Sequence, residues 1–255
     1  MRINLIPMAG EGQRFKDVGY TTPKPLIDVD GLPMIVRAAR ALPPADKYIF
    51  VCRKEHLETF PIEKILQQHF LDPIIISVNR LTEGQACTCI LAKEYIPEDA
   101  ILTIGASDND MTYDSQLVEN MFQNYSIDGW IWTFRKNSVV LQNPAMYGWV
   151  DTKANNSALK VSCKIPLSIN PINDHAVIGA FTFKRAKIFF DAVDAMIKAN
   201  DRINNEFYVD VAANYAIQLG YNLNVCEVEH YICWGTPKDY EQYEYWLHYF
   251  RKRLL

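Results

Sequence analysis

The sequence predicts a mixed α/β protein whose central β-sheet is mostly parallel and is covered by helices on both faces. Short apolar runs of strand length recur through the first half of the 255 residues, and helical patterns with one apolar face separate them. Strands of a parallel sheet are buried on both sides and are therefore expected to be continuously apolar, as these runs are. Residues that suit ligand binding follow several of the runs, at the sheet edge where ligands gather in this fold class.

In the first half, the expected strands cover residues 3–6, 48–52, 74–78 and 101–105. A helix is expected to open at Gly31-Leu32-Pro33, because proline is favoured in the first turn of a helix. A second helix over 55–70 is expected to kink at Pro61, where the backbone loses a donor.

In the second half, strands are expected at 130–134 and 176–183, and helices at 186–199 and 206–219. The last of these ends at Gly220, a residue favoured just beyond a helix C-terminus. A C-terminal helix is expected over 239–250. It carries an apolar stripe that docks on the protein's own core or, alternatively, serves a homodimer: Tyr240, Tyr243, Trp246, Leu247 and Phe250.

Composition excludes several classes of protein. A hydrophobic fraction of 49% and a charged fraction of 22% are those of an ordinary soluble protein. The net charge of −4 and the lack of basic runs argue against nucleic-acid binding, and no window reaches the roughly 18 apolar residues of a membrane span. The six cysteines show neither a Cys-x-x-Cys pair nor zinc spacing, which favours reduced thiols in a cytoplasmic protein.

The loop after the first strand suits a phosphate group. Gly10 and Gly12 allow main-chain N–H groups to approach an anion, and Arg14 and Lys24 add positive charge. A Gly-x-Gly turn alone is common. The dinucleotide-binding fingerprint would need a third glycine where Phe15 stands, and a P-loop would need Gly-Lys-Ser/Thr.

Two further segments follow expected strands. One segment is Thr82-Glu83-Gly84-Gln85. It can be interpreted as a plain glycine turn, or as a loop that approaches a nucleobase and offers it the Gln85 amide as donor and acceptor. The other contains Asp108 and Asp110, two positions apart, which form either an acidic turn or a pair of carboxylates that reach one Mg²⁺ ion.

In combination, these motifs resemble those of the nucleotidylyltransferases that activate sugar phosphates and related phosphorylated small molecules. The resemblance covers nearly the whole chain. Its most specific parts are Gly10-Glu11-Gly12-Gln13-Arg14-Phe15 with Pro23-Lys24-Pro25-Leu26, and Gly235-Thr236-Pro237-Lys238-Asp239. It implies a Rossmann-like, glycosyltransferase-A-type three-layer sandwich in one domain of residues 1–255. About 1–112 would form the nucleotide-binding half and about 113–255 the acceptor-binding half, which has a mixed sheet.

The resemblance also implies roles for residues. Arg14 and the loop amides would hold the departing pyrophosphate, Lys24 would neutralise the α-phosphate, and Asp108, with Asp110 as a weaker candidate, would bind Mg²⁺. The nucleotide would further contact Met8, Ala9, Gly10, Glu11, Gly12, Gln13, Thr82, Glu83, Gly84 and Gln85. The acceptor would contact Lys164, Asp174, His175, Asn205 and Glu206. A capped loop at 173–175 and helix capping by Asn204 or Asn205 are the structural alternatives.

Three positions depart from the family pattern. Gln13 stands where Ser or Thr is usual, Cys163 where a glutamate reads sugar hydroxyls, and Cys233 where many relatives have a second metal-binding aspartate. Asp110, Glu206 or Asp210 could stand in for that second carboxylate. Cys163 leaves non-hexose acceptors open, such as polyol, amino-alcohol or amino-acid phosphates.

The predicted reaction joins a nucleoside triphosphate, with CTP slightly favoured over UTP, GTP and dTTP, to a phosphorylated small molecule and releases pyrophosphate. Asn204-Asn205-Glu206-Phe207-Tyr208 resembles the branch found in capsule and surface-polysaccharide pathways. Two alternatives are a metal-dependent glycosyltransferase that uses Asp108-Asn109-Asp110, and a non-catalytic nucleotide-binding subunit.

Overall fold

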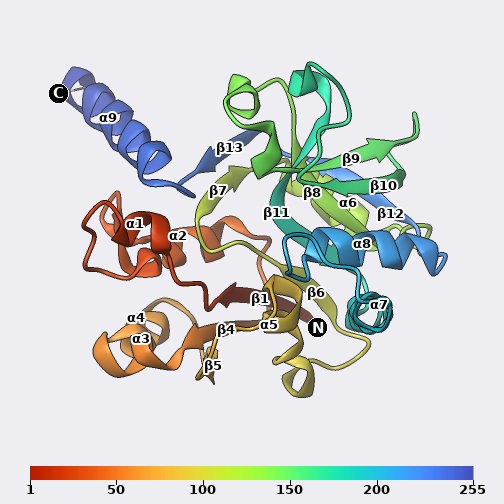
Figure 1. Cartoon of the computed structure of the whole chain (residues 1–255), viewed down its shortest axis with the longest axis horizontal. Helices are drawn as coiled ribbons and strands as arrows, with labels where there is room; N and C mark the ends of the chain where they lie inside the picture. Colours follow the sequence, from red (N-terminus) through yellow and green to blue (C-terminus); the bar gives the residue numbers. More distant parts are fainter. Residues whose placement is uncertain (255) are drawn as a thin grey trace.

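The structure, a computed structural model, describes residues 1–254 and shows a nine-stranded sheet between two helical layers (Figure 1). Seven strands follow the order β10-β9-β11-β6-β1-β4-β5, and β8 pairs with both β11 and β12. The strands of this sheet are β1 (Arg2–Met8), β4 (Lys47–Arg53), β5 (Ile74–Val78), β6 (Ile101–Ile104), β8 (Gly129–Phe134), β9 (Gly148–Thr152), β10 (Ala158–Cys163), β11 (His175–Phe183) and β12 (Leu223–Glu227).

The sheet has a parallel and a mixed part. β6, β1, β4 and β5 run parallel, with Leu5 paired to both Ile49 and Ile104. β11 is antiparallel to its three neighbours, and β12 is parallel to β8. This arrangement confirms the predicted mixed α/β class with a parallel first half and a mixed second half.

Two apolar clusters, one on each face of the sheet, hold the layers together. The first face is covered by α5 (Gln85–Ile90), α7 (Ala186–Ala199) and α8 (Val209–Gln218). The second is covered by α2 (Met34–Ala41), α4 (Ile62–His69) and α6 (Ser115–Gln123). The predicted three-layer sandwich is therefore confirmed. Smaller elements are α1 (Gln13–Lys16), α3 (Lys54–Thr59), the strand pairs β2 (Asp28–Val29) with β3 (Leu32–Pro33) and β7 (Asn109–Thr112) with β13 (His230–Cys233), and five 3₁₀ turns.

Three predicted helix bounds were wrong. Leu32 and Pro33 form β3, so Pro33 precedes α2 instead of lying in its first turn. Pro61 separates two helices, α3 and α4, because its ring and missing N–H end the helix outright. The predicted helix 206–219 begins only at Val209.

The late start of α8 has a local cause. Asn204 and Asn205 adopt φ of 51° and 65°, and Ile203 and Glu206 exchange two backbone hydrogen bonds around them. Two adjacent left-handed residues form a tight hairpin turn, for which asparagine is well suited. The two asparagines therefore make a turn and cap no helix.

The C-terminal helix α9 (Pro237–Leu254) extends away from the rest of the molecule (Figure 1). At its base, Tyr240 and Tyr243 pack against a cluster that contains Phe15 and Trp234. Farther along, Trp246 is exposed by 47% and Phe250 by 57%. The predicted stripe is thus docked only over its first two turns.

Other expectations concern the chain as a whole. Within residues 1–254, no helix combines the length and the apolar character needed to cross a bilayer. All six cysteines are free thiols. Burial alone raises the pKa of Cys52 and Cys226 to about 12, so these thiols are unreactive core residues.

Candidate functional site

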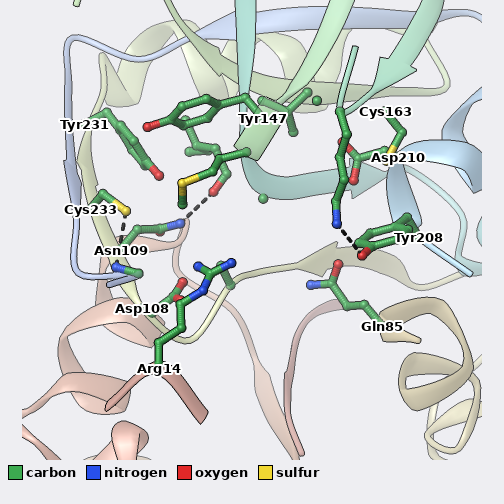
Figure 2. A pocket seen from close by; sticks show the side chains of 18 of the residues that line it. Arg14, Gln85, Asp108, Asn109, Tyr147, Cys163, Tyr208, Asp210, Tyr231 and Cys233 are labelled. Carbon is green, nitrogen blue, oxygen red and sulfur yellow. Dashed lines mark hydrogen bonds between the residues drawn. The ribbon is translucent and has the colours of Figure 1, made fainter. Parts of the chain in front are cut away.

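A pocket of about 270 Å³ opens beyond the carboxyl ends of β1 and β6 (Figure 2). Arg14 and Asp108 line one side, and Lys164, Tyr208 and Asp210 line the opposite side. A second pocket of about 440 Å³ adjoins it, because Arg14, Lys24 and Gly235 line both. The two pockets form one site that receives side chains from both halves of the sheet.

The loop that follows β1 presents unpaired amides to the second pocket, which residues 10–15 line. Gly12 has φ of 64°, and its carbonyl accepts hydrogen bonds from the amides of Phe15 and Lys16. In the described chain, the amides of Gly10, Glu11 and Gly12 donate to no protein group. The side chain of Phe15 is buried, which holds the loop in place. These free donors suit an anion.

Lys24 connects Asp108 with the segment that precedes α9. Its Nζ donates to Asp108 Oδ2 at 2.5 Å and to the Gly235 carbonyl at 2.9 Å. Pro23 and Pro25 restrict the backbone on either side, which fixes where the side chain leaves the chain. Lys24 and Asp108, which are 84 residues apart in sequence, therefore meet in the pocket.

The Gly-Thr-Pro-x-Asp motif forms the start of α9. Thr236 Oγ1 and Asp239 Oδ2 are 2.6 Å apart, and each side chain accepts a hydrogen bond from the other's amide. This reciprocal pair is a capping box with Pro237 at the first helical position, so the motif starts α9. It also leaves the Gly235 carbonyl free to accept from Lys24.

The loop 82–85 is hydrogen-bonded to the segment that precedes α8. The Phe207 amide donates to the Glu83 carbonyl at 2.8 Å, and the Ala86 amide donates to the Phe207 carbonyl at 3.0 Å. Gly84 lies between them with φ of 119°, and a Cβ there would come within 2.6 Å of the Phe207 backbone. Thr82, Gly84 and Gln85 line a further pocket of about 250 Å³ beside Pro7 and Ala9.

A bulge in β11 shapes the wall of the central pocket. The pairing of β11 with β8 shifts register between Val177 and Phe181, and Gly179 has φ of 81°. The bulge frees the Ile178 carbonyl, which accepts from Asn109 Nδ2 at 2.6 Å. Asn109 is thereby fixed in the pocket beside Asp108 (Figure 2).

Cys163 ends β10, and Lys164 follows it with φ of 61°. Lys164 Nζ donates to the Tyr208 hydroxyl at 2.6 Å. Burial raises the pKa of Cys163 to about 12, and the nearby Asp210 adds to the shift. Cys163 therefore stays a neutral thiol beside two charged side chains (Figure 2).

Several predicted site residues lie elsewhere. Asp110 does not line the central pocket. Burial raises the pKa of its carboxyl group, and a hydrogen bond from the Met111 backbone and the charge of Arg37 only partly oppose that shift. His175 is buried, with Nδ1 2.9 Å from Thr133 Oγ1, and Asp174 accepts from Ser168 at the surface. Neither lines the pocket.

The remaining predicted acceptor residues, Asn205 and Glu206, also lie outside the central pocket. Asn205 lies in the exposed hairpin turn, and Glu206 lines the second pocket and the pocket beside Pro7 and Ala9, not the central one. Of the five predicted acceptor contacts, only Lys164 lies in the central pocket. Sequence reasoning assigned no role to Tyr147 and Tyr208, and it named Asp210 only as a possible substitute for the missing metal-binding carboxylate. Asp210 does line this pocket, but it lies beside Lys164 and apart from Asp108 (Figure 2).

Whether the site can hold a divalent metal depends on the donor atoms of its side chains. Among the described residues, no group of three or more His, Cys, Asp or Glu side chains converges on one point. Mg²⁺ commonly takes only one or two protein carboxylates and completes its shell with phosphate oxygens and water. Asp108, with one oxygen on Lys24, fits this role once a polyphosphate supplies the other ligands. Cys233, a protonated thiol whose pKa burial raises to about 11, does not fit Mg²⁺.

No protein-family model and no curated protein sequence matches the chain. Several solved structures, however, resemble it. A nucleoside-diphosphate-sugar pyrophosphorylase from Vibrio cholerae RC9 shares 21% identity and a TM-score of 0.76 over 94% of this chain and 98% of that one.

An inositol-1-phosphate CTP transferase from T. maritima shares 14% identity and a TM-score of 0.74 over 96% of this chain and 95% of that chain. A UTP-bound UGPase from Acinetobacter baumannii shares 16% identity and a TM-score of 0.73, over 98% and 93% of the two chains. The predicted resemblance is confirmed at the level of architecture: this chain has the Rossmann-like fold of the nucleotidyltransferases.

Proposed function

We propose that this chain is a nucleotidylyltransferase, which joins a nucleoside triphosphate to a phosphorylated small molecule and releases pyrophosphate. One observation carries the proposal. Arg14, Lys24 and the free amides of the loop after β1 lie on one side of a continuous site, and Lys164 lies on the opposite side. Two separate sets of phosphate-binding groups therefore face one space, as a reaction between two phosphates requires.

In the proposed reaction, an oxygen of the acceptor phosphate attacks the α-phosphorus of the triphosphate in line. A new P–O bond forms there, and the bond to the bridging oxygen of the β-phosphate breaks, so that pyrophosphate leaves. The acceptor phosphate is largely ionised near pH 7, so it needs no general base. Such transfers depend mainly on positioning and on neutralisation of charge.

The chain's own residues divide these tasks. Arg14 and the loop amides hold the leaving pyrophosphate, Lys24 neutralises the α-phosphate, and Lys164 orients the attacking phosphate. Asp108 would hold Mg²⁺, which neutralises charge on the phosphate oxygens when bound. About 1–112 would form the nucleotide-binding half, and about 113–255 the acceptor-binding half.

Cytosine is the base that we propose first. Glu206, a residue with a carboxylate side chain, also lines the pocket beside Gln85. A carboxylate accepts hydrogen bonds from an exocyclic amino group, and cytosine is the pyrimidine that offers one. Glu206 thus supports CTP over UTP and dTTP.

The cellular setting is part of the proposal. The six free thiols support a reducing compartment such as the cytoplasm. The run Asn204-Asn205-Glu206-Phe207-Tyr208 supports a role in making precursors of capsule or surface polysaccharide. The exposed aromatic end of α9 is compatible with a homodimer.

The test is pyrophosphate release by the purified chain with Mg²⁺, in which each of CTP, UTP, GTP and dTTP is paired with a panel of sugar, polyol and amino-alcohol phosphates. We expect release that depends on one triphosphate, one acceptor class and Mg²⁺. Arg14→Ala serves as the negative control. Transfer of a sugar from a nucleotide sugar without pyrophosphate release would instead support a glycosyltransferase, and binding without turnover of any pair would support a non-catalytic subunit.

A further inference from the structure

The acceptor end of the central pocket holds a carboxylate without a cationic partner. Asp210 lies in the first turn of α8 and lines the pocket beside Lys164 (Figure 2). Lys164 Nζ is engaged with the Tyr208 hydroxyl, and among residues 1–254 no lysine or arginine forms an ion pair with Asp210. Asp108, at the other end of the pocket, is paired with Lys24.

The backbone opposite Asp210 leaves a slot for this carboxylate. Gly148 begins β9, and a Cβ placed on it would lie 1.9 Å from Asp210 Oδ1. Gly148 pairs with Cys163 across the strands β9 and β10. Any other residue at position 148 would force the Asp210 side chain to move, so glycine here keeps the carboxylate in the pocket wall.

The electrostatic setting of Asp210 favours a ligand that donates a hydrogen bond. Burial raises the pKa of Asp210 to about 6, and a hydrogen bond from its own backbone amide and the charge of Lys164 only partly oppose the shift. A partly buried charge with few hydrogen-bond donors is costly. When an acceptor phosphate occupies Lys164, the lysine charge is compensated by that phosphate, and Asp210 then depends on the ligand itself for a further donor.

On the basis of the proposed function, we infer that Asp210 determines acceptor specificity by accepting a hydrogen bond from a hydroxyl or ammonium group close to the acceptor's phosphate. The acceptor class is accordingly a phosphorylated polyol, sugar or amino alcohol, not a simple alkyl phosphate. The adjacent thiol of Cys163 is a weak hydrogen-bonding group, so it does not compete for this donor.

The test compares wild type with Asp210→Asn, using matched acceptor phosphates that do or do not carry the donor group. We expect Asp210→Asn to raise the KM for the donor-bearing acceptor about 10- to 100-fold, the range for a hydrogen bond to a charged group, with the triphosphate KM unchanged. The KM for the acceptor without the donor stays constant, so discrimination between the two collapses. Asp151→Asn, an exposed aspartate on the same strand as Gly148, is the matched control.

The same experiment distinguishes an ammonium donor from a hydroxyl donor on the acceptor. An ammonium-bearing acceptor loses more affinity than a hydroxyl-bearing one when the carboxylate becomes an amide, because it also loses charge pairing. Gly148→Ala, which displaces Asp210 without removing it, is the second variant and is expected to reduce discrimination as well.

The outcomes are distinguishable. If wild type releases pyrophosphate but Asp210→Asn keeps the same discrimination between matched acceptors, the inference about Asp210 is wrong and the proposed function stands. If wild type releases no pyrophosphate with any pair, the proposed function fails and the role of Asp210 fails with it.

Discussion

Replacement of Asp210 by Asn is expected to stabilise the folded protein at neutral pH, although it impairs acceptor binding. Burial raises the pKa of this carboxyl from its ordinary value of 3.8 to about 6, so the folded state holds the proton more tightly than the unfolded chain. The stability linked to that proton is fully present below about pH 4. It is lost as the pH rises from about 4 through 6, where the folded state must carry a partly buried charge.

The magnitude follows from the pKa shift. About two pKa units at about 1.4 kcal/mol each give a destabilisation of about 3 kcal/mol in wild type above pH 7. Asparagine carries no charge, so Asp210→Asn removes this cost, less the smaller penalty of burying an amide. With an unfolding entropy of about 2 cal/mol/K per residue, a gain of 3 kcal/mol raises Tm by at most about 6 °C for this chain of 255 residues.

The assay is thermal unfolding of wild type and variant between pH 4.5 and pH 8, without ligands. We expect the variant's Tm advantage to be largest near pH 8 and to shrink steadily toward pH 4.5. A variant that is less stable than wild type at pH 8, or an advantage that does not change with pH, would refute the electrostatic reasoning about this pocket.

Three further outcomes are expected. Lys24→Met lowers kcat for pyrophosphate release about 100-fold or more, because it removes a charge on the α-phosphate; a loss under tenfold would remove its assigned role. Gly84→Ala lowers the free energy of unfolding by at least about 2 kcal/mol, because position 84 has a positive φ and an added Cβ clashes with Phe207. In the control Gly10→Ala the added Cβ meets open space, so Tm changes little. Equal Tm values for the two variants would contradict the close contact between Gly84 and Phe207. Burial lowers the pKa of His175, so wild type loses stability as pH falls below about 6.5, and His175→Gln is expected to flatten this loss in Tm-versus-pH curves.

The parallel half of the fold was predictable because local patterns decide it. Strands buried on both faces must be continuously apolar, and β1, β4, β5 and β6 lie where such runs occur. Lys24 and Asp108 could be expected in one site because both follow features of that half. The structure pairs them, and the roles assigned to them stay predictions.

The second half of the chain resisted prediction because long-range pairing shapes it. β9, β10 and β12 take their places through cross-strand partners that no local period reveals. The same applies to Asp210, which is brought to the pocket by α8 and admitted by Gly148 on a different element. His175 shows the reverse error, since a histidine beside an expected loop is a buried member of β11.

The most direct test of the whole account is a crystal structure of the chain with the preferred triphosphate and Mg²⁺. The account predicts that the β- and γ-phosphates lie on the amides of the loop after β1 and on Arg14, with Asp108 on the metal and the α-phosphate beside Lys24. A triphosphate bound with its phosphates outside this site, and with the Lys24–Asp108 pair untouched, would contradict it.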